Sequence, residues 1–203
     1  MSTVKKVGII GGTFNPIHLG HLILAEHAYS EYELDEILFV PTGISHFKDP
    51  NIVLDKKMRI AMTGGAIEDN PHFALSTIET DRPGNSYTYE TLEELKRLNP
   101  DTDYYLIVGA DALFQMDQWM HPEIIMKDAK ILVAVRKGQS LKDLEDKAHE
   151  MKDKFGAEIF ILNTPYIDIS STEIRERINQ GKSVRYMIAE HTLKYIERNE
   201  LYR

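Results

Sequence analysis

Two histidines and a run of small residues near the N-terminus have the types and spacing that phosphate binding requires. Residues 11–21 read GGTFNPIHLGH and directly follow the apolar segment Val7–Ile10. Glycine lets a ligand approach the backbone closely, and the first N–H groups of a helix attract anions. His18 and His21 are three residues apart, so both imidazoles face one side of a helix. The segment therefore predicts a phosphate site built from a strand, a glycine loop and a helix.

Other nucleotide and metal motifs do not fit this segment. It lacks both the G-x-G-x-x-G of dinucleotide-binding dehydrogenases and the G-x-x-x-x-G-K-S/T of Walker A loops. The zinc-protease pattern needs histidines four residues apart with a glutamate between them, and no third ligand is evident near His18 and His21. We therefore expect no protein-bound metal. A tight turn with two surface histidines is the structural alternative to a phosphate site.

A second candidate for phosphate binding comes late in the chain, where residues 169–175 read ISSTEIR. Ser170 and Glu173 have the spacing of a capping box, which by itself predicts only the start of a helix. Arg175 is not explained by capping, because a cation in the first turns lies toward the positive end of the helix dipole. A bound polyanion would reverse that penalty, and the hydroxyls, N–H groups and guanidinium would then converge on it.

A third group of residues is suited to binding a small acidic or aromatic ligand. Thr88 is a candidate N-cap in the segment GNSYTYETL (84–92), and the exposed amides around it could accept a carboxylate. Trp119 is the only tryptophan, a residue that usually lies in a core or an interface. Asp111 follows Gly109 at the end of a predicted strand, where it could bond a ribose hydroxyl or cap the next helix.

The elements that must position these residues alternate between apolar and amphipathic, as in a parallel α/β sheet. We expect strands at Val4–Ile10, Glu36–Val40, Tyr104–Val108, Lys130–Val135 and Glu158–Leu162, with a further one at His72–Ile78. We expect helices at Leu19–Tyr32, Asp55–Glu68, Thr88–Leu98, Leu141–Phe155, Ser171–Asn179 and Met187–Asn199. The fold class is therefore α/β, a Rossmann-like doubly wound parallel sheet with a helical C-terminal portion, in a single domain over residues 1–203.

Composition narrows the function classes. The 203 residues carry a net charge of −8, so we expect no broad face for nucleic acid. The chain has no cysteine, which excludes disulfides and thiolate metal sites and fits a reducing cytoplasm. No apolar stretch reaches the roughly 18 residues that span a bilayer, so we expect neither a membrane segment nor a signal peptide. The sequence does not decide the oligomeric state, and a homodimer is compatible with it.

The two phosphate motifs together resemble the signature of the nucleotidyltransferase superfamily. GGTFNPIHLGH and ISSTEIR, in this order, look like those of the bacterial nicotinate mononucleotide adenylyltransferases, and the resemblance covers essentially the full length. It implies an enzyme that transfers the adenylyl group of ATP to nicotinate mononucleotide, giving nicotinate adenine dinucleotide and pyrophosphate. It also implies that Mg²⁺ is carried by ATP and pyrophosphate, because magnesium needs few protein ligands.

The resemblance further assigns expected roles to individual residues. The catalytic residues would be His18, His21 and Arg175. ATP would contact Gly11, Gly12, Thr13, Phe14, His18, His21, Lys48, Ile169, Ser170, Ser171, Thr172 and Arg175. Nicotinate mononucleotide would contact Asn15, Tyr87, Thr88, Gly109, Asp111, Trp119 and Arg136. The nicotinate carboxylate would lie near Tyr87 and Thr88, and the Trp119 indole would stack on the pyridine ring.

Other functions stay open at this point. The acceptor could be nicotinamide mononucleotide or phosphopantetheine, although Thr88 and Trp119 favour nicotinate. A non-catalytic nucleotide-binding protein on the same fold is a further alternative, against which the presence of both histidines and Arg175 argues. An NAD-dependent oxidoreductase would need the G-x-G-x-x-G motif that the chain lacks.

Overall fold

The computed structural model describes residues 4–44, 52–135, 140–165 and 167–203. Contacts group the chain into two compact units, each assembled from three segments of the sequence. Unit 1 comprises Met1–Ile10, Leu24–Leu38 and Ser86–Tyr166, and unit 2 comprises Gly11–Ile23, Phe39–Asn85 and Ile167–Arg203. The single domain expected over residues 1–203 stays a prediction.

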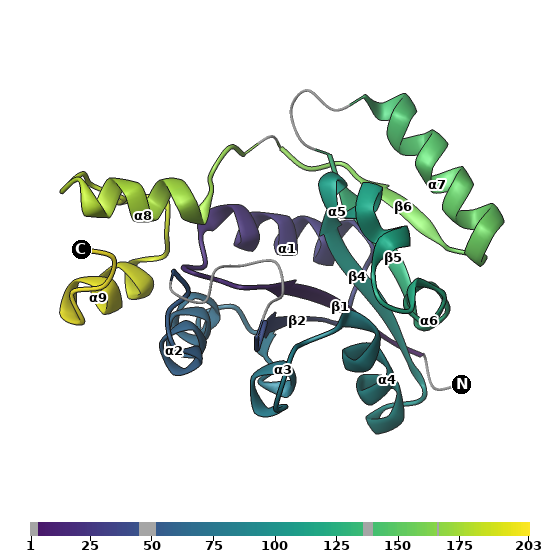
Figure 1. The fold of residues 1–203 in the computed structure, drawn as a ribbon, viewed down its shortest axis with the longest axis horizontal. Helices are drawn as coiled ribbons and strands as arrows, with labels where there is room; N and C mark the ends of the chain where they lie inside the picture. The colour runs from purple at the N-terminus through teal and green to yellow at the C-terminus, as the bar shows by residue number, and fades with distance from the viewer. Residues whose placement is uncertain (1–3, 45–51, 136–139, 166) are drawn as a thin grey trace. The chain divides into compact units, whose positions relative to one another are not determined.

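Within the described residues, six strands form one sheet in the order β3-β2-β1-β4-β5-β6 (Figure 1). The pairs β1–β4, β4–β5 and β5–β6 are parallel. This is the strand order of a doubly wound sheet. Successive strands are added toward one edge from β1 to β3 and toward the other edge from β4 to β6, and such folds bind ligands at the switch point between β1 and β4. The predicted Rossmann-like α/β class is therefore confirmed. The strands are β1 (Lys5–Gly12), β2 (Glu36–Pro41), β3 (Phe73–Leu75), β4 (Thr102–Gly109), β5 (Ala129–Ala134) and β6 (Ile159–Leu162).

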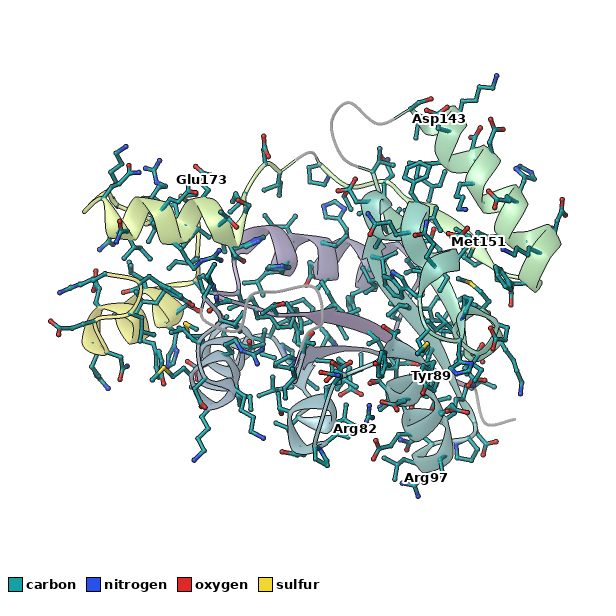
Figure 2. The ribbon with its side chains drawn as sticks, viewed as in Figure 1. Arg82, Tyr89, Arg97, Asp143, Met151 and Glu173 are labelled. Atoms are coloured by element: carbon teal, nitrogen blue, oxygen red, sulfur yellow. The ribbon has the colours of Figure 1, made fainter. Side chains whose placement is uncertain are left out.

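In unit 1, α5 (Ala110–Gln115) contacts β4 and β5, α6 (Pro122–Asp128) contacts β5, and the ends of α7 (Leu141–Phe155) are marked in the sequence. The longest helix, α7, begins where the Ser140 hydroxyl accepts the N–H of Asp143 at 3.3 Å. It ends at Gly156, whose φ of 69° only glycine adopts readily. The helix packs on α5 and α6 and buries Met151, which is labelled in Figure 2. The other helices here are α1 (Leu19–Glu31) from Leu24 on, α4 (Thr88–Leu98), α5 (Ala110–Gln115), the 3-10 turn η1 (Met116–Gln118) and α6 (Pro122–Asp128).

Unit 2 contains the first turn of α1 and the helical C-terminal portion that the sequence predicts. Its helices are α2 (Lys56–Ile67), α3 (Ile78–Asp81), α8 (Ser171–Asn179) and α9 (Glu190–Arg198). Figure 1 shows α2 beside α9, and the Thr192 hydroxyl of α9 donates to the Met62 carbonyl of α2 at 3.2 Å. The C-terminal part of the chain also contacts residues 11–17, which begin at the end of β1 and are called the glycine segment below.

The structure differs from the sequence predictions mainly in short elements. The strand expected at His72–Ile78 is only Phe73–Leu75, and α3 begins at its end. The last helix begins at Glu190, not at Met187. Helices α3, α5 and α6 have four, six and seven residues, too few for a helical period to stand out in the sequence. No helix in the described part of the chain has both the length and the hydropathy to cross a membrane.

Candidate active site

The two glycines at the end of β1 are followed by a buried phenylalanine. Gly11 and Gly12 end β1, and Gly11 is exposed with no atom near the position of a Cβ. Phe14 takes a left-handed backbone conformation with a φ of 47°, and the residue is only 2% exposed. Its ring packs against those of Phe39 and His21, with the centroids 6.1 and 5.1 Å apart. The ring of Phe14 is therefore buried and not available to a ligand.

The two histidines lie against each other, as their spacing predicts. His18 precedes α1 and His21 is in its first turn, and their rings stack with centroids 3.7 Å apart and planes 28° from parallel. The His18 backbone N–H donates to Nδ1 of His21 at 3.2 Å. Because Nδ1 of His21 accepts this bond, the ring proton of the neutral imidazole is on Nε2, which is then a donor.

Gly20, between the histidines, is required by this packing. A Cβ at residue 20 would lie 3.0 Å from Nδ1 of His18, tighter than nine in ten real Cβ contacts, so the His18 ring would have to shift by a few tenths of an ångström. His18 is itself buried, with 8% of its surface exposed, so its ring has little room to move away. The glycine in HLGH therefore serves the stacking of the two rings.

The second motif lies directly against the first, although 155 to 160 residues separate them in the sequence. The Ser171 hydroxyl donates to the Pro16 carbonyl at 2.8 Å, and Nη1 of Arg175 donates to the Asn15 carbonyl at 2.9 Å. Nη2 of Arg175 donates to the Thr172 hydroxyl at 3.2 Å. Both motifs belong to unit 2, and the structure brings them together there.

The start of α8 is capped as the sequence predicts. Ser170 has the extended backbone of an N-cap, and its hydroxyl accepts the N–H of Glu173 at 3.1 Å. Glu173, labelled in Figure 2, has its carboxylate 3.9 Å from Nη1 of Arg177. One backbone N–H of the first turn is thus satisfied by Ser170. The others of the first turn cannot bond within the helix and are suited to an anion.

Two residues that the sequence motifs do not include hold the segment around Thr13 and Asn15 in unit 2. Arg59 of α2 is only 2% exposed, and its guanidinium donates to the carbonyls of Thr13, Gly43 and Leu54 at 2.8, 3.3 and 3.1 Å. Burial lowers the pKa of Arg59 from its usual value. The sequence carried one signal, because Arg59 shares the apolar face of its helix with Met62, Thr63 and Ala66. The second residue is Tyr202, whose hydroxyl donates to Oδ1 of Asn15 at 2.9 Å.

The residues expected to bind the mononucleotide are mostly in unit 1, and two capping roles considered for them, those of Thr88 and Asp111, are wrong. Thr88 is not the N-cap of α4. The helix begins at Thr88, and Tyr87 is the cap, with extended backbone and no side-chain capping bond. Gly109 is the N-cap of α5, so Asp111 does not cap that helix but lies exposed in its first turn. Trp119 follows η1 directly and is half-buried. Its backbone N–H donates to the Met116 carbonyl at 3.2 Å.

Of three further expected contacts, the structure describes only one. Ile169 precedes the cap of α8 and is half-buried. Lys48 and Arg136 lie outside the described residues. In the described ranges, no group of three or more His, Cys, Asp or Glu side chains could hold a metal ion.

Comparison with known proteins identifies the family. The profile of the family described as cytidylyltransferase-like matches residues 9–177. The chain is 42% identical over 199 residues to a probable nicotinate-nucleotide adenylyltransferase of Lachnoclostridium phytofermentans, covering 98% of this chain and 100% of that protein. A protein of the same name from Clostridium tetani is 39% identical over 200 residues, which cover 98% of this chain and 100% of that protein.

Solved structures show the same fold. Nicotinic acid mononucleotide adenylyltransferase of Plasmodium falciparum, in complex with NaAD, has a TM-score of 0.81 at 21% identity, covering 98% of this chain and 97% of that one. Its complex with APC gives 0.79 at 20% identity, with the same coverage. On the family match and the identity to its relatives, the chain belongs to the cytidylyltransferase-like family and, within it, to the nicotinate-nucleotide adenylyltransferases.

Proposed function

We propose that this enzyme transfers the adenylyl group of ATP to nicotinate mononucleotide, forming nicotinate adenine dinucleotide and releasing pyrophosphate. The observation that carries the proposal is the joining of Ser171 and Arg175 to the glycine segment that leads to the two histidines. It gathers helix N–H groups, a guanidinium and an imidazole N–H donor in one unit. The names of the relatives supply the acceptor, nicotinate mononucleotide.

The reaction needs no protein nucleophile. An oxygen of the mononucleotide phosphate attacks the α-phosphorus of ATP, the bond from that phosphorus to the oxygen of the β-phosphate breaks, and pyrophosphate leaves. Catalysis of this kind is mainly positioning and stabilisation of charge. We assign Nε2–H of His21 to an α-phosphate oxygen, with His18 holding the ring of His21 in place by stacking.

The start of α8 is suited to the leaving pyrophosphate. Its first-turn N–H groups that cannot bond within the helix, together with the helix dipole, favour negative charge. In the described part of the chain, Arg175 uses two of its N–H groups on uncharged oxygens, those of Asn15 and Thr172. The guanidinium has five N–H donors in all, so others can meet phosphate oxygens. The remaining proposed ATP contacts are Gly11, Gly12, Thr13, Phe14, Lys48, Ile169, Ser170, Ser171 and Thr172.

We propose that magnesium enters and leaves with the phosphates. Bound there, Mg²⁺ neutralises part of the phosphate charge and keeps several of its waters, so it needs few protein ligands. The guanidinium and backbone N–H groups at this site can donate to phosphate oxygens and cannot ligate a cation. Removal of Mg²⁺ with a chelator is expected to abolish turnover. The melting temperature of the protein measured without substrates should stay unchanged.

Recognition of the mononucleotide is proposed for unit 1, with Asn15 and Arg136 as further contacts. The first N–H groups of α4, next to Tyr87 and Thr88, are suited to the carboxylate that distinguishes nicotinate from nicotinamide. The Trp119 ring is proposed to stack on the pyridine ring, and Gly109 and Asp111 to contact the ribose. Because only nicotinate carries this negative charge, the amide mononucleotide is expected to react more slowly.

The test is a pyrophosphate-release assay with ATP and each of three acceptors in turn. We expect turnover with nicotinate mononucleotide and a lower kcat/KM with nicotinamide mononucleotide or phosphopantetheine. A higher kcat/KM with either of these two would assign a different acceptor. Binding of ATP without pyrophosphate release with any acceptor would make the protein a nucleotide-binding protein and not a transferase.

Trp119→Ala is expected to raise KM for nicotinate mononucleotide by about 2- to 30-fold, the equivalent of a cation–π contact of roughly 0.5–2 kcal/mol. KM for ATP should stay unchanged, because the proposed ATP contacts are other residues. Steady-state kinetics with each substrate varied in turn measures both constants. Trp119→Phe is the matched control, since it keeps an aromatic face and should recover most of the loss. Equal changes in the two KM values would contradict the stacking role.

A further inference from the structure

We infer that Tyr202, in the segment after α9, is a positioning residue of the active site: its hydroxyl fixes Asn15, and Asn15 in turn holds Arg175. This inference rests on the proposed function, because it assigns Tyr202 a role in placing the groups that bind ATP. It adds a residue that lies outside both phosphate motifs.

The Asn15 side chain joins three segments of unit 2. Its Oδ1 accepts from the Tyr202 hydroxyl at 2.9 Å and from the Leu54 backbone N–H at 3.2 Å, and its Nδ2 donates to the Ile52 carbonyl at 2.9 Å. Asn15 is only 4% exposed, so water cannot readily replace any of these partners. Both lone pairs of Oδ1 are thus used, and the orientation of the amide is set by its neighbours.

The backbone of the same residue meets the proposed phosphate-binding arginine. The Asn15 carbonyl accepts from Nη1 of Arg175, and in the described part of the chain the only other hydrogen-bond partner of this guanidinium is Thr172 of its own helix. A shift of the Asn15 backbone would therefore move the acceptor that holds Arg175. The Tyr202 hydroxyl opposes such a shift from the other end of the residue, because it is one of the three partners that anchor the Asn15 side-chain amide.

The surroundings of Tyr202 make it a permanent donor and not a proton-transfer group. Burial raises its pKa, and the charged groups that act on it are Arg175 of α8 and Arg59 of α2, which oppose the rise. The hydroxyl therefore stays protonated through the neutral range and beyond, and it donates throughout. Its role is to hold an amide in place.

Loss of the Tyr202 hydroxyl should leave the fold intact, because Arg59 holds the glycine segment independently. The Arg59 guanidinium bonds the carbonyls of Thr13, Gly43 and Leu54, and none of these bonds involves Tyr202. Tyr202→Phe keeps the ring and removes only the bond to Asn15. The variant therefore tests the position of Asn15 and Arg175, not the presence of the segment.

The experiment compares wild type, Tyr202→Phe and the matched control Tyr186→Phe in steady-state kinetics and in calorimetric titration with Mg²⁺–ATP alone. Tyr186 is 82% exposed and undergoes the same chemical change. We expect Tyr202→Phe to lower kcat by about 10-fold, since small displacements of positioned groups cost up to about 100-fold. The Kd for ATP should rise severalfold, and Tyr186→Phe should match wild type.

The readouts separate a positioning role from the alternatives. A lower melting temperature with unchanged kcat and unchanged Kd for ATP would make Tyr202 merely structural and would overturn the inference. Loss of one limb of the pH–rate profile would make it an acid or base and would also overturn it. If wild type transfers no adenylyl group, the proposed function fails, but the titration still decides whether Tyr202 organises the ATP site.

A pH series tests the buried hydroxyl itself. Because the pKa of Tyr202 is higher in the folded than in the unfolded chain, the folded state binds its proton more tightly above about pH 10. Wild type should therefore lose stability relative to Tyr202→Phe as the pH rises past about 10, where an unfolded tyrosine ionises. Melting temperatures of both proteins between neutral and strongly alkaline pH measure this. A constant difference would show that the hydroxyl is not held as described and would overturn the inference.

Discussion

His21→Ala is expected to lower kcat by about 10²- to 10³-fold, the usual cost of removing a donor to a transition-state oxygen. The physical reason is that Nε2–H of His21 is proposed to donate to the α-phosphate, where negative charge is redistributed as the bond to pyrophosphate breaks. Because Nδ1 accepts the His18 N–H, the donor is already in its required tautomer before ATP binds. Single-turnover measurement of dinucleotide formation isolates this step from product release.

The control for this prediction is His27→Ala, which removes an imidazole from the same helix at a position outside both motifs. It should keep kcat within about 2-fold of wild type, as expected for a residue with no part in the chemistry. A His21→Ala enzyme with near wild-type kcat would remove His21 from the mechanism. A rise in KM for ATP with unchanged kcat would mean that His21 binds ground state and transition state equally.

Arg59→Met is expected to destabilise the protein by about 3–5 kcal/mol, because it leaves three carbonyls without their charged donor in a site that water barely reaches. For a chain of this size that loss corresponds to a fall in melting temperature of about 10 °C or more. The methionine fills much of the same space, so the lost hydrogen bonds and not a cavity dominate the effect. Thermal and urea denaturation, monitored by circular dichroism, measure it.

Two variants make the Arg59 result interpretable. Arg198→Met places the same change on the exposed end of α9 and should alter stability by less than about 0.5 kcal/mol. Arg59→Lys keeps the charge but cannot span three carbonyls with one ammonium group, so we expect a loss between those of the other two. A melting temperature for Arg59→Met equal to that of Arg198→Met would contradict the bracing of the glycine segment by Arg59.

Much of the fold is predictable because its signals are local. The buried strands are nearly continuous apolar runs, and α4, α7 and α8 have the predicted bounds since caps or amphipathic periods mark their ends. The same locality explains the errors. Threonine is a better capping residue than tyrosine, so residue type alone favours Thr88 as the N-cap of α4. In the structure Thr88 is already helical, and Tyr87, with extended backbone and no side-chain capping bond, is the N-cap. The short α5 and α6 carry too few residues to show a period.

The two motifs, their order along the chain, and the strand and helices that carry them are recognisable from local sequence patterns. How the motifs are held depends on contacts between residues far apart in the chain. The hydroxyl of Tyr202 and the guanidinium of Arg59 reach Asn15 and Thr13 across 187 and 46 residues of chain. The physical reason is that a motif is read from neighbours in sequence, whereas a buried polar group must find its partner wherever the packed chain supplies one.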